Sequence, residues 1–553
     1  MKISTVGLGF GLGLVLAGLA FGQPSFGQSP PIEVASLTPQ RIVIAPARTD
    51  LAATIRAGLL TRMTAARTGA AADEARQLYY FYGERYFEPI WLEPTAAGQV
   101  SFSDRAGAII ELFRAAGREG LRPEDYLTPD LDPVLAGTDP VRLAALETAF
   151  SAAALRYATH IHTGRIRPQD VSGFIDVQPK PIDEAALLLE LARSDDPAAI
   201  FARLEPQHPE FHALKAALAR YDDAGAARPA PIAGGALIRP GSSDPRLPAI
   251  RERLALVAAL DPTVYDTMTL EAVKQFQRDA GLDPDGVIGP ATITALNGGL
   301  PTSRADILAN MERWRWMPAD LGSFNVVVNI PEYRLFINDG GRQAYTTRVV
   351  VGTARNQTPV FSDNIRHIVV NPYWNVPNSI IRGEIAPAVM RNPDYLGRQN
   401  MELLYGGSVV SAASVNWGAV AAANSFPFRV RQRPGPGNAL GQIKFLFPNK
   451  HDVYLHDTPS RGLFSRDARA FSHGCVRVEN PMEFAEALTA YESNISRASL
   501  EGLFGPSERW VNPERQIPVH LTYFTVRVDE AGNLQSFGDL YGHNERLIAL
   551  MDL

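Results

Sequence analysis

The hydrophobic pattern of the chain changes from helical to strand-like partway along, and this change constrains the fold more than any other feature. From Asp50 to about Tyr221 apolar residues recur at helical spacing, whereas from Phe324 onward short β-branched runs alternate with Asn, Asp and Gly turns. A chain of 553 residues is also too long for one hydrophobic core, since compact domains usually hold ~100–200 residues. The sequence therefore predicts a multidomain α+β protein.

Three segments carry the helical pattern most clearly. An aromatic helix begins at Leu78–Tyr82, a second covers Ala106–Ala116, and a third covers Pro140–Thr163 and ends where Gly164 can form the C-cap. These segments predict a helical scaffold with an aromatic core. The later runs predict an antiparallel sheet or sandwich, with strands at Val326–Ile330, Tyr333–Ile337, Tyr345–Val351, Ile365–Val370, Gln442–Phe447, Asp452–Leu455 and Val519–Val528.

The first residues have the pattern of a secretory signal peptide. Met1 and Lys2 form a short positive region, Val6–Phe21 is uncharged, and Ala20 and Gly22 occupy the −3 and −1 positions of a cleavage site. The alternative is an uncleaved anchor, although the apolar run is short and rich in glycine for a membrane span. We therefore expect an exported protein without a stable transmembrane segment.

Composition and pattern together divide the chain into eight segments. They are a signal peptide (1–22), a flexible linker (23–48), a helical scaffold domain (49–222), a linker (223–244), a small three-helix domain (245–300), a connecting helix (301–322), a mainly-β domain (323–500) and a C-terminal segment with a further strand (501–553).

The small domain has a short but consistent motif. Thr269–Gln277 predicts a helix, Asp285-Gly286 and Gly289-Pro290 predict tight turns, and Pro290 fits the first turn of a helix that ends near Leu296. This AVKQFQ…GL…DG.IGPAT pattern resembles the three-helix peptidoglycan-binding module. The alternative is a helical spacer that has lost its ligand-binding site. This alternative stays open because ligand binding is judged from the geometry of a site and not from its fold.

Charge and cysteine content exclude several classes of function. Lys and Arg number 53 against 59 Asp and Glu, and this slight acidity gives no electrostatic support for nucleic-acid binding. No glycine-rich phosphate loop follows any predicted strand, so nucleotide chemistry is not supported. The lone cysteine, Cys475, excludes an intrachain disulfide and a cysteine-rich metal site.

The surroundings of Cys475 favour nucleophilic chemistry over an inert buried thiol. A thiol is mostly protonated at neutral pH and needs a neighbouring imidazole to become a good nucleophile. His473 is too near Cys475 in sequence, whereas His456 can approach from another strand. Gly474 leaves backbone N–H groups free to face a carbonyl oxygen, as an oxyanion hole requires. A metal site built from His451, His456 and His473 lacks a carboxylate or thiolate at typical spacing, so we expect no metal.

His456 followed by Ser472-His473-Gly474-Cys475-Val476-Arg477 resembles the signature of the L,D-transpeptidases, which have a YkuD-type catalytic domain. Further similar stretches lie at 326–331, 349–352, 358–362, 371–377 and 436–441, and the domain order is similar to that of the large Gram-negative members. The resemblance implies the following roles: Cys475 as nucleophile, His456 as general base, the backbone carbonyl of Asp457 as third triad member, the backbone at Gly474 and Cys475 as oxyanion hole, Tyr454, Ser472, His473 and Arg477 lining the donor site, Trp374 facing the substrate, and a capping subdomain at about 377–442.

The resemblance also implies a reaction and a location. It implies 3→3 crosslinking of peptidoglycan in the periplasm: a tetrapeptide donor releases D-alanine, a diaminopimelate amine is the acceptor, and no cofactor is needed. Cell-wall synthesis proteins would be partners and carbapenems would be inhibitors. Three alternative activities remain possible for the same active site: a carboxypeptidase, another hydrolase, or a lipoprotein-to-peptidoglycan transferase. An alternative from another functional class is a non-catalytic peptidoglycan-binding protein.

Overall fold

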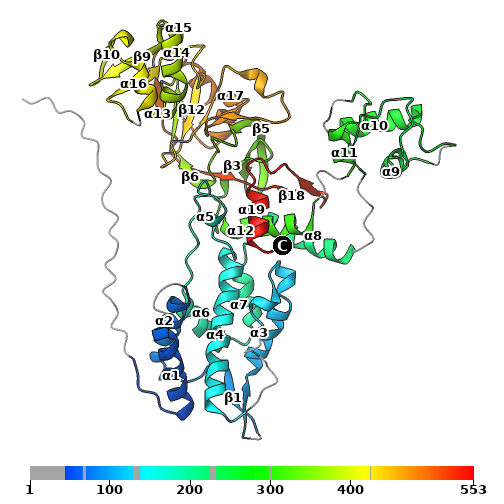
Figure 1. The fold of residues 1–553 in the computed structure, drawn as a ribbon, viewed down its shortest axis with the longest axis vertical. Coiled ribbons are helices and arrows are strands. Elements are labelled where there is room, and N and C mark those ends of the chain that lie inside the picture. The colour runs from blue at the N-terminus through cyan, green and yellow to red at the C-terminus, as the bar shows by residue number, and fades with distance from the viewer. Residues whose placement is uncertain are drawn as a thin grey trace, which may run out of the picture.

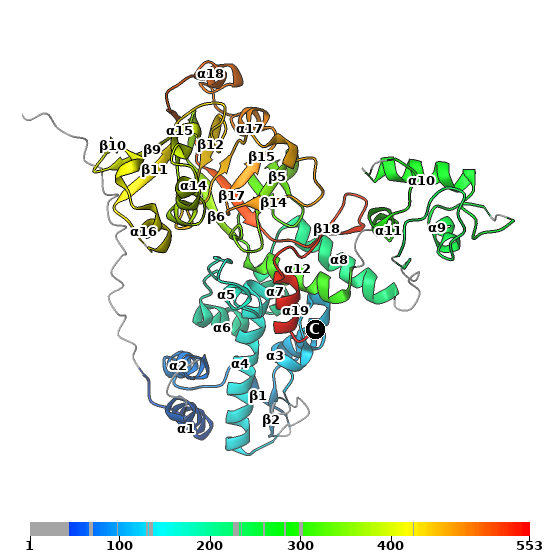
Figure 2. The same ribbon diagram turned by 45° about the horizontal axis from the view of Figure 1, so that its top comes forward.

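The computed structural model describes residues 44–65, 70–96, 98–128, 131, 137–224, 232–233, 235–257, 260–280, 282, 284–297, 302–423 and 425–553. The predicted signal peptide, most of the first linker and part of the second linker lie outside these residues. None of the helices in the described ranges is long and apolar enough to cross a membrane. The scaffold lies below the mainly-β domain in Figure 1, and the small three-helix domain stands to one side in both views (Figures 1 and 2).

The scaffold packs around the long helix α4, as the helical pattern predicts. Asp139 caps this helix by accepting the N–H of Val141, Pro140 begins it, and Gly164 ends it. Aromatic side chains fill the core, including Trp91, Phe113, Phe150 and Tyr157. The elements are α1 (Asp50–Ala65), α2 (Ala70–Gly83), β1 (Leu92–Pro94), β2 (Val100–Phe102), α3 (Asp104–Arg114), η1 (Ala116–Glu119), η2 (Pro123–Asp125), α4 (Pro140–Thr163), α5 (Pro168–Val171), α6 (Glu184–Arg193), α7 (Pro197–Leu204) and α8 (Pro209–Ala224).

The small domain holds α9 (Leu247–Arg253), α10 (Thr267–Asp279) and α11 (Pro290–Leu296), so both helices of its motif are confirmed. Gln277 ties the turn between them, because its amide accepts the N–H of Gly286 and donates to the carbonyl of Val287. Its buried apolar residues form a cluster of their own, separate from the other cores.

Helix α12 (Arg304–Trp316) connects the scaffold to the mainly-β domain. Trp314 stacks on Phe524 at 4.5 Å between ring centroids, and the buried carboxylate of Glu312 accepts the N–H groups of Arg165 and Ile166 at 2.5 and 2.8 Å. The same apolar cluster contains α8, α12 and the sheet, and α12 lies beside α8 and α19 (His543–Leu550) in Figure 2. The connecting helix is therefore part of the core that supports the sheet.

The main sheet has eleven strands in the order β16-β7-β12-β13-β15-β5-β4-β3-β17-β6, with β14 paired to β5. The strands are β3 (Phe324–Asn329), β4 (Arg334–Asp339), β5 (Arg342–Gly352), β6 (Phe361–Ile365), β7 (His367–Val370), β12 (Ile443–Leu446), β13 (Leu455–His456), β14 (Ala470–Ser472), β15 (Val476–Val478), β16 (Arg509–Val511) and β17 (Ile517–Thr522). Only Arg366 separates β6 from β7, although they lie toward opposite ends of this order, so the sheet curls on itself.

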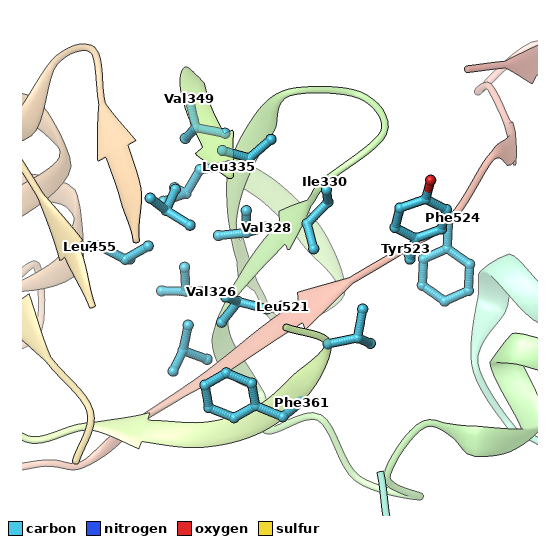
Figure 3. Close-up of a cluster of buried hydrophobic side chains, with 14 of the residues drawn as sticks. Val326, Val328, Ile330, Leu335, Val349, Phe361, Leu455, Leu521, Tyr523 and Phe524 are labelled. Carbon is cyan, nitrogen blue, oxygen red and sulfur yellow. The ribbon is translucent and has the colours of Figure 1, made fainter. Parts of the chain in front are cut away.

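The prediction of an antiparallel sheet is wrong for three strand pairs. Strands β3 and β17, β13 and β15, and β14 and β5 are parallel. Strand β17 comes from the C-terminal segment and returns beside β3 after almost two hundred residues, a crossover that short-range turn signals cannot show. Figure 3 shows Val326 and Val328 of β3 packed near Leu521 of β17, with Leu455 of β13 reaching the same cluster.

Two predicted strands are divided in the structure and one is shortened. Ile365–Val370 splits at Arg366, Val519–Val528 splits into β17 and β18 (Val526–Val528), and β18 pairs with β19 (Leu534–Ser536). Asp452–Leu455 is mostly a loop, because Asp452 adopts a φ of 53° and leaves the extended conformation. Helices α17 (Pro481–Leu488) and α18 (Arg497–Glu501) follow β15.

The capping subdomain has its own sheet and its own core. Its strands lie in the order β10-β9-β11-β8, apart from the main sheet, and its apolar cluster is separate. The elements are β8 (Trp374–Asn375), α13 (Asn378–Ile380), η5 (Ile381–Ile385), α14 (Ala386–Arg391), α15 (Tyr395–Arg398), β9 (Met401–Tyr405), β10 (Ser408–Val410), η6 (Ala412–Ser414), α16 (Trp417–Ala422) and β11 (Phe428–Gln432).

Candidate active site

Parallel pairing of β13 with β15 brings the predicted base and nucleophile to one face of the sheet. Leu455 lies opposite Val476, and both are fully buried in the core. Because side chains alternate along a strand, their neighbours point to the other face. That face forms the floor of a pocket of about 1000 Å³, and the predicted site residues that line it are Trp374, Tyr454, His456, Ser472, His473, Cys475 and Arg477.

The imidazole of His456 is buried and fixed by its own backbone neighbour. Its Nδ1 lies 2.5 Å from the carbonyl oxygen of Asp457. A carbonyl can only accept, so Nδ1 carries the proton and Nε2 keeps a free lone pair. Burial, together with the charges of Arg477 and Lys444, lowers the pKa of His456 to about 3, against the hydrogen bond to the carbonyl of Asp457. The geometry therefore holds a neutral imidazole.

The carboxylate of Asp457 is engaged away from the imidazole. It accepts the N–H of Gln442 at 2.9 Å, the N–H of Thr458 at 2.6 Å and the guanidinium of Arg461 at 2.5 Å. Gly441 makes room for it, since a Cβ there would lie 2.2 Å from an Asp457 carboxylate oxygen and the φ is +61°. The side chain anchors the loop after β13, while the backbone carbonyl orients His456.

The thiol of Cys475 is partly exposed to the pocket and uncharged at rest. Burial raises its pKa to about 11, against hydrogen bonds from the backbone and side chain of Tyr454 and the charge of Arg477. The sulfur lies 3.7 Å from the carbonyl oxygen of Asp452. Among the described residues no hydrogen bond joins it to His456. Such catalytic contacts are often long without substrate and shorten in the complex.

Hydrogen bonds within the turn before Cys475 use two of the predicted site residues. The hydroxyl of Ser472 donates to the carbonyl of Cys475 at 2.5 Å and accepts the N–H of Gly474 at 3.2 Å. The hydroxyl of Thr358 donates to the carbonyl of Gly474 at 2.7 Å. The N–H of Cys475 belongs to that same peptide, so it points away from Thr358. It has no hydrogen bond to any residue that the structure describes.

The capping subdomain contacts the turn that carries Cys475. Nε2 of His473 lies 2.7 Å from a carboxylate oxygen of Glu384, and both side chains are about half exposed. Glu384 belongs to η5, and Trp374 reaches the same pocket from β8. The cap therefore forms one wall of the pocket and contacts the turn that carries the nucleophile through Glu384 and His473.

Sequence analysis missed two residues that shape the site. Lys444 of β12 lies opposite His456 in the strand register and lines the pocket; a lone lysine inside the apolar strand Gln442–Phe447 was the available signal. Thr358 is distant in sequence from Cys475, and no periodic pattern could have joined them. No group of three or more His, Cys, Asp or Glu side chains in the described ranges is arranged to hold a metal ion.

Comparison with known families assigns three parts of the chain. Residues 76–218 match a family described as "Scaffold domain". Residues 248–296 match one described as "Putative peptidoglycan binding domain", and residues 323–495 match one described as "L,D-transpeptidase catalytic domain". The three matches follow one another in the order that the sequence predicts.

The chain is also similar to a "Putative L,D-transpeptidase" of Haemophilus influenzae, with 36% identity over 263 residues that cover 46% of this chain and 52% of the relative. It thus spans about half the length of this curated relative.

Among solved structures, an L,D-transpeptidase of Xylanimonas cellulosilytica is 17% identical, with 53% of this chain and 100% of that chain covered and a TM-score of 0.18. One from Mycobacterium smegmatis is 12% identical, with 36% and 58% covered and a TM-score of 0.18. TM-scores this low add nothing to the fold described above. The family matches confirm the resemblance seen in the sequence: the chain carries an L,D-transpeptidase catalytic domain of the YkuD type, together with a scaffold domain and a peptidoglycan-binding domain.

Proposed function

We propose that the protein is an L,D-transpeptidase that forms 3→3 peptidoglycan crosslinks through an acyl-enzyme on Cys475. The observation that carries this proposal is the shared face of β13 and β15. It presents an oriented, neutral His456 and the thiol of Cys475 to one pocket. A neutral imidazole can accept a thiol proton, which is the requirement for a general base.

The first half-reaction transfers an acyl group from the donor stem to the enzyme. The sulfur of Cys475 attacks the carbonyl carbon between the L-centre of diaminopimelate and the terminal D-alanine, and Nε2 of His456 takes the thiol proton. The N–H of Cys475 is our candidate oxyanion donor, since the N–H of Gly474 is engaged by Ser472. The carbon–nitrogen bond then breaks, His456 returns the proton to the leaving amine, and D-alanine departs.

The second half-reaction resolves the thioester. The side-chain amine of diaminopimelate on a neighbouring stem attacks the thioester carbon, and His456 accepts a proton from it. The carbon–sulfur bond breaks and the thiol is restored by that proton. The cap wall limits access of water to the thioester, so the acceptor amine competes favourably. Tyr454, Arg477, His473 and Trp374 surround the donor in this proposal.

The small domain is proposed to hold the enzyme on the peptidoglycan that supplies both stems. This substrate requires an extracytoplasmic location, and we propose the periplasm in agreement with the predicted signal peptide. Other cell-wall synthesis proteins are the proposed partners.

Muropeptide analysis tests the crosslinking activity. Cells that express the wild type should gain 3→3 dimers, detected by mass spectrometry, and cells that express Cys475→Ala should not. Identical muropeptides from the two strains would contradict the proposal, and a gain of tripeptides without dimers would identify a carboxypeptidase instead.

A further inference from the structure

A row of charged and titratable side chains crosses three neighbouring strands at the floor of the pocket. Lys444 of β12 pairs with His456 of β13, and His456 pairs with Arg477 of β15. Residues directly opposite in neighbouring strands point to the same face of a sheet. The imidazole therefore lies between two cationic side chains, and all three residues line the pocket.

Lys444 is more than nine-tenths buried and has no hydrogen bond to any described residue. Its side chain keeps only 9% exposure, and the nearest carboxylate oxygen, on Glu508, is 4.0 Å away. That carboxylate already accepts the N–H of Tyr373 at 2.9 Å and the indole N–H of Trp510 at 3.1 Å. A largely buried lysine with no hydrogen bond and one carboxylate at 4.0 Å is stabilised further when an anion in the pocket binds its ammonium group.

The ammonium group of Lys444 lies near Tyr454, a residue that also neighbours the sulfur of Cys475. Its Nζ lies 5.8 Å from the ring centroid of Tyr454 and 6.0 Å from that of Trp510. Tyr454 also hydrogen-bonds to the sulfur of Cys475. Tyr454 therefore neighbours both the ammonium and the nucleophile, and all three residues line the same pocket.

Arg477 provides a second cation with unused donors on the other side of His456. Its Nε is buried without a hydrogen-bond partner, and its side chain is only partly exposed to the pocket. A guanidinium presents several N–H groups in a fixed plane that suits a carboxylate. Both cations thus have donors available for an anionic ligand.

We infer that Lys444 and Arg477 form a subsite for the free terminal carboxylate of the donor stem, an inference that rests on the proposed function. In that donor the leaving residue bears its carboxylate one carbon beyond the scissile amide nitrogen. When the carbonyl carbon reaches Cys475, this carboxylate lies within about one residue length, ~3.5 Å. Lys444 is thereby a specificity residue for stems that end in a free acid.

Binding of this carboxylate also bears on the base. The charges of Arg477 and Lys444 lower the pKa of His456 in the free enzyme. An anion held between them offsets both charges and makes proton transfer to His456 easier. The carboxylate of the donor thus favours the imidazolium form of His456 only in the complex between enzyme and donor, where proton transfer takes place.

The test compares two synthetic donors that differ only at the carboxyl terminus, a tetrapeptide stem with a free acid and the same stem with a terminal carboxamide. Acylation of Cys475 is followed by intact-protein mass spectrometry in the full-length protein. The wild type should acylate about tenfold or more faster with the acid, the range expected for a hydrogen bond to a charged group. Lys444→Met should lose this preference, so that its own rates with the acid and with the carboxamide differ by less than about threefold.

Matched variants separate charge from folding. Lys444→Arg keeps the cation and should keep the preference for the acid, and Lys450→Met, on an exposed lysine paired with Asp176, should behave as the wild type. Equal rates with both donors in the wild type would overturn the inference while leaving the proposed function intact. So would an unchanged acid preference in Lys444→Met. A wild type that acylates with neither donor would instead overturn the proposed function and the inference with it.

Discussion

Replacing Thr358 by valine should slow acylation of Cys475 by removing the hydroxyl that orients the neighbouring peptide. Thr358 is fully buried, and its hydroxyl accepts the N–H of Gly352 at 2.9 Å and donates to the carbonyl of Gly474 at 2.7 Å. Valine has nearly the same shape, so the change leaves one N–H and one carbonyl unpaired without a cavity. At ~1–3 kcal/mol for each of these two groups, the free energy of unfolding should fall by about 2–6 kcal/mol.

The effect on chemistry follows from the peptide that Thr358 holds. Its far side carries the N–H of Cys475, and loss of an oxyanion donor slows acyl transfer by ~10²–10³-fold. A donor that is loosened rather than removed should cost less, so we expect acylation by a carbapenem or a donor stem to slow by about 10–100-fold. Alkylation of Cys475 by iodoacetamide forms no oxyanion and should change by less than about threefold.

Intact-protein mass spectrometry measures both reactions, with Thr358→Ser as the matched control because it keeps the hydroxyl. Circular dichroism at the assay temperature establishes that both variants are folded. If folded Thr358→Val is acylated as fast as Thr358→Ser, the hydrogen bond to Gly474 does not orient the donor. Equal slowing of alkylation and acylation would mean that the thiol itself has moved, which also refutes the reasoning.

Three further predictions concern ionisation and the loop after β13. His456→Gln should abolish acylation by a carbapenem, whereas His451→Gln should retain it within about threefold; equal activity of the two variants would exclude His456 as the base. Because burial raises the pKa of Cys475 to about 11, its alkylation rate should rise about tenfold per pH unit from pH 7 to 9. A plateau below pH 8 would instead indicate a preformed thiolate–imidazolium pair. Asp457→Asn should weaken the contact with Arg461 and lower the melting temperature by a few degrees, while His456 keeps its backbone partner and acylation continues. Loss of acylation in a folded variant would assign the carboxylate a direct role.

Local sequence signals predicted the bounds of two helices well, because caps and periodicity act over a few residues. Helix α4 has the predicted bounds and ends at Gly164, and α11 begins at Pro290 and ends at Leu296 as predicted. The start of the aromatic helix was wrong, since Leu78–Tyr82 lies near the end of α2 (Ala70–Gly83) and not at its beginning. The strand pairing of the sheet was harder to predict from the sequence, since parallel pairs such as β3 and β17 join segments that lie far apart in the chain. Nothing near Val519 indicates that it lies opposite Val326, because that register depends on the whole crossover between them.

The residues of the candidate site also fall into two groups, those that the sequence predicts and those that it does not. The cluster around Cys475 was visible because its short turn concentrates chemically distinctive residues. Lys444 and Thr358 were missed because each reaches the site through strand register or a buried hydrogen bond. The roles of Ser472 and Gly474 also depend on three-dimensional detail, since both polar groups are engaged within the turn. Motifs identify reacting atoms more readily than the residues that orient them.

The resting charge state of the site bears on how a partly exposed thiol stays intact in the extracytoplasmic location that we propose. The thiolate is the form that oxidants modify and that attacks disulfides, and burial raises the pKa of Cys475 and so favours the thiol. Burial, with the charges of Arg477 and Lys444, lowers the pKa of His456 at the same time and favours the neutral imidazole. A donor that brings a carboxylate changes this balance, because its charge offsets the two cations beside the base. If the proposed subsite is correct, the same row of side chains that selects the donor also restricts activation of the thiol to the complex with the donor.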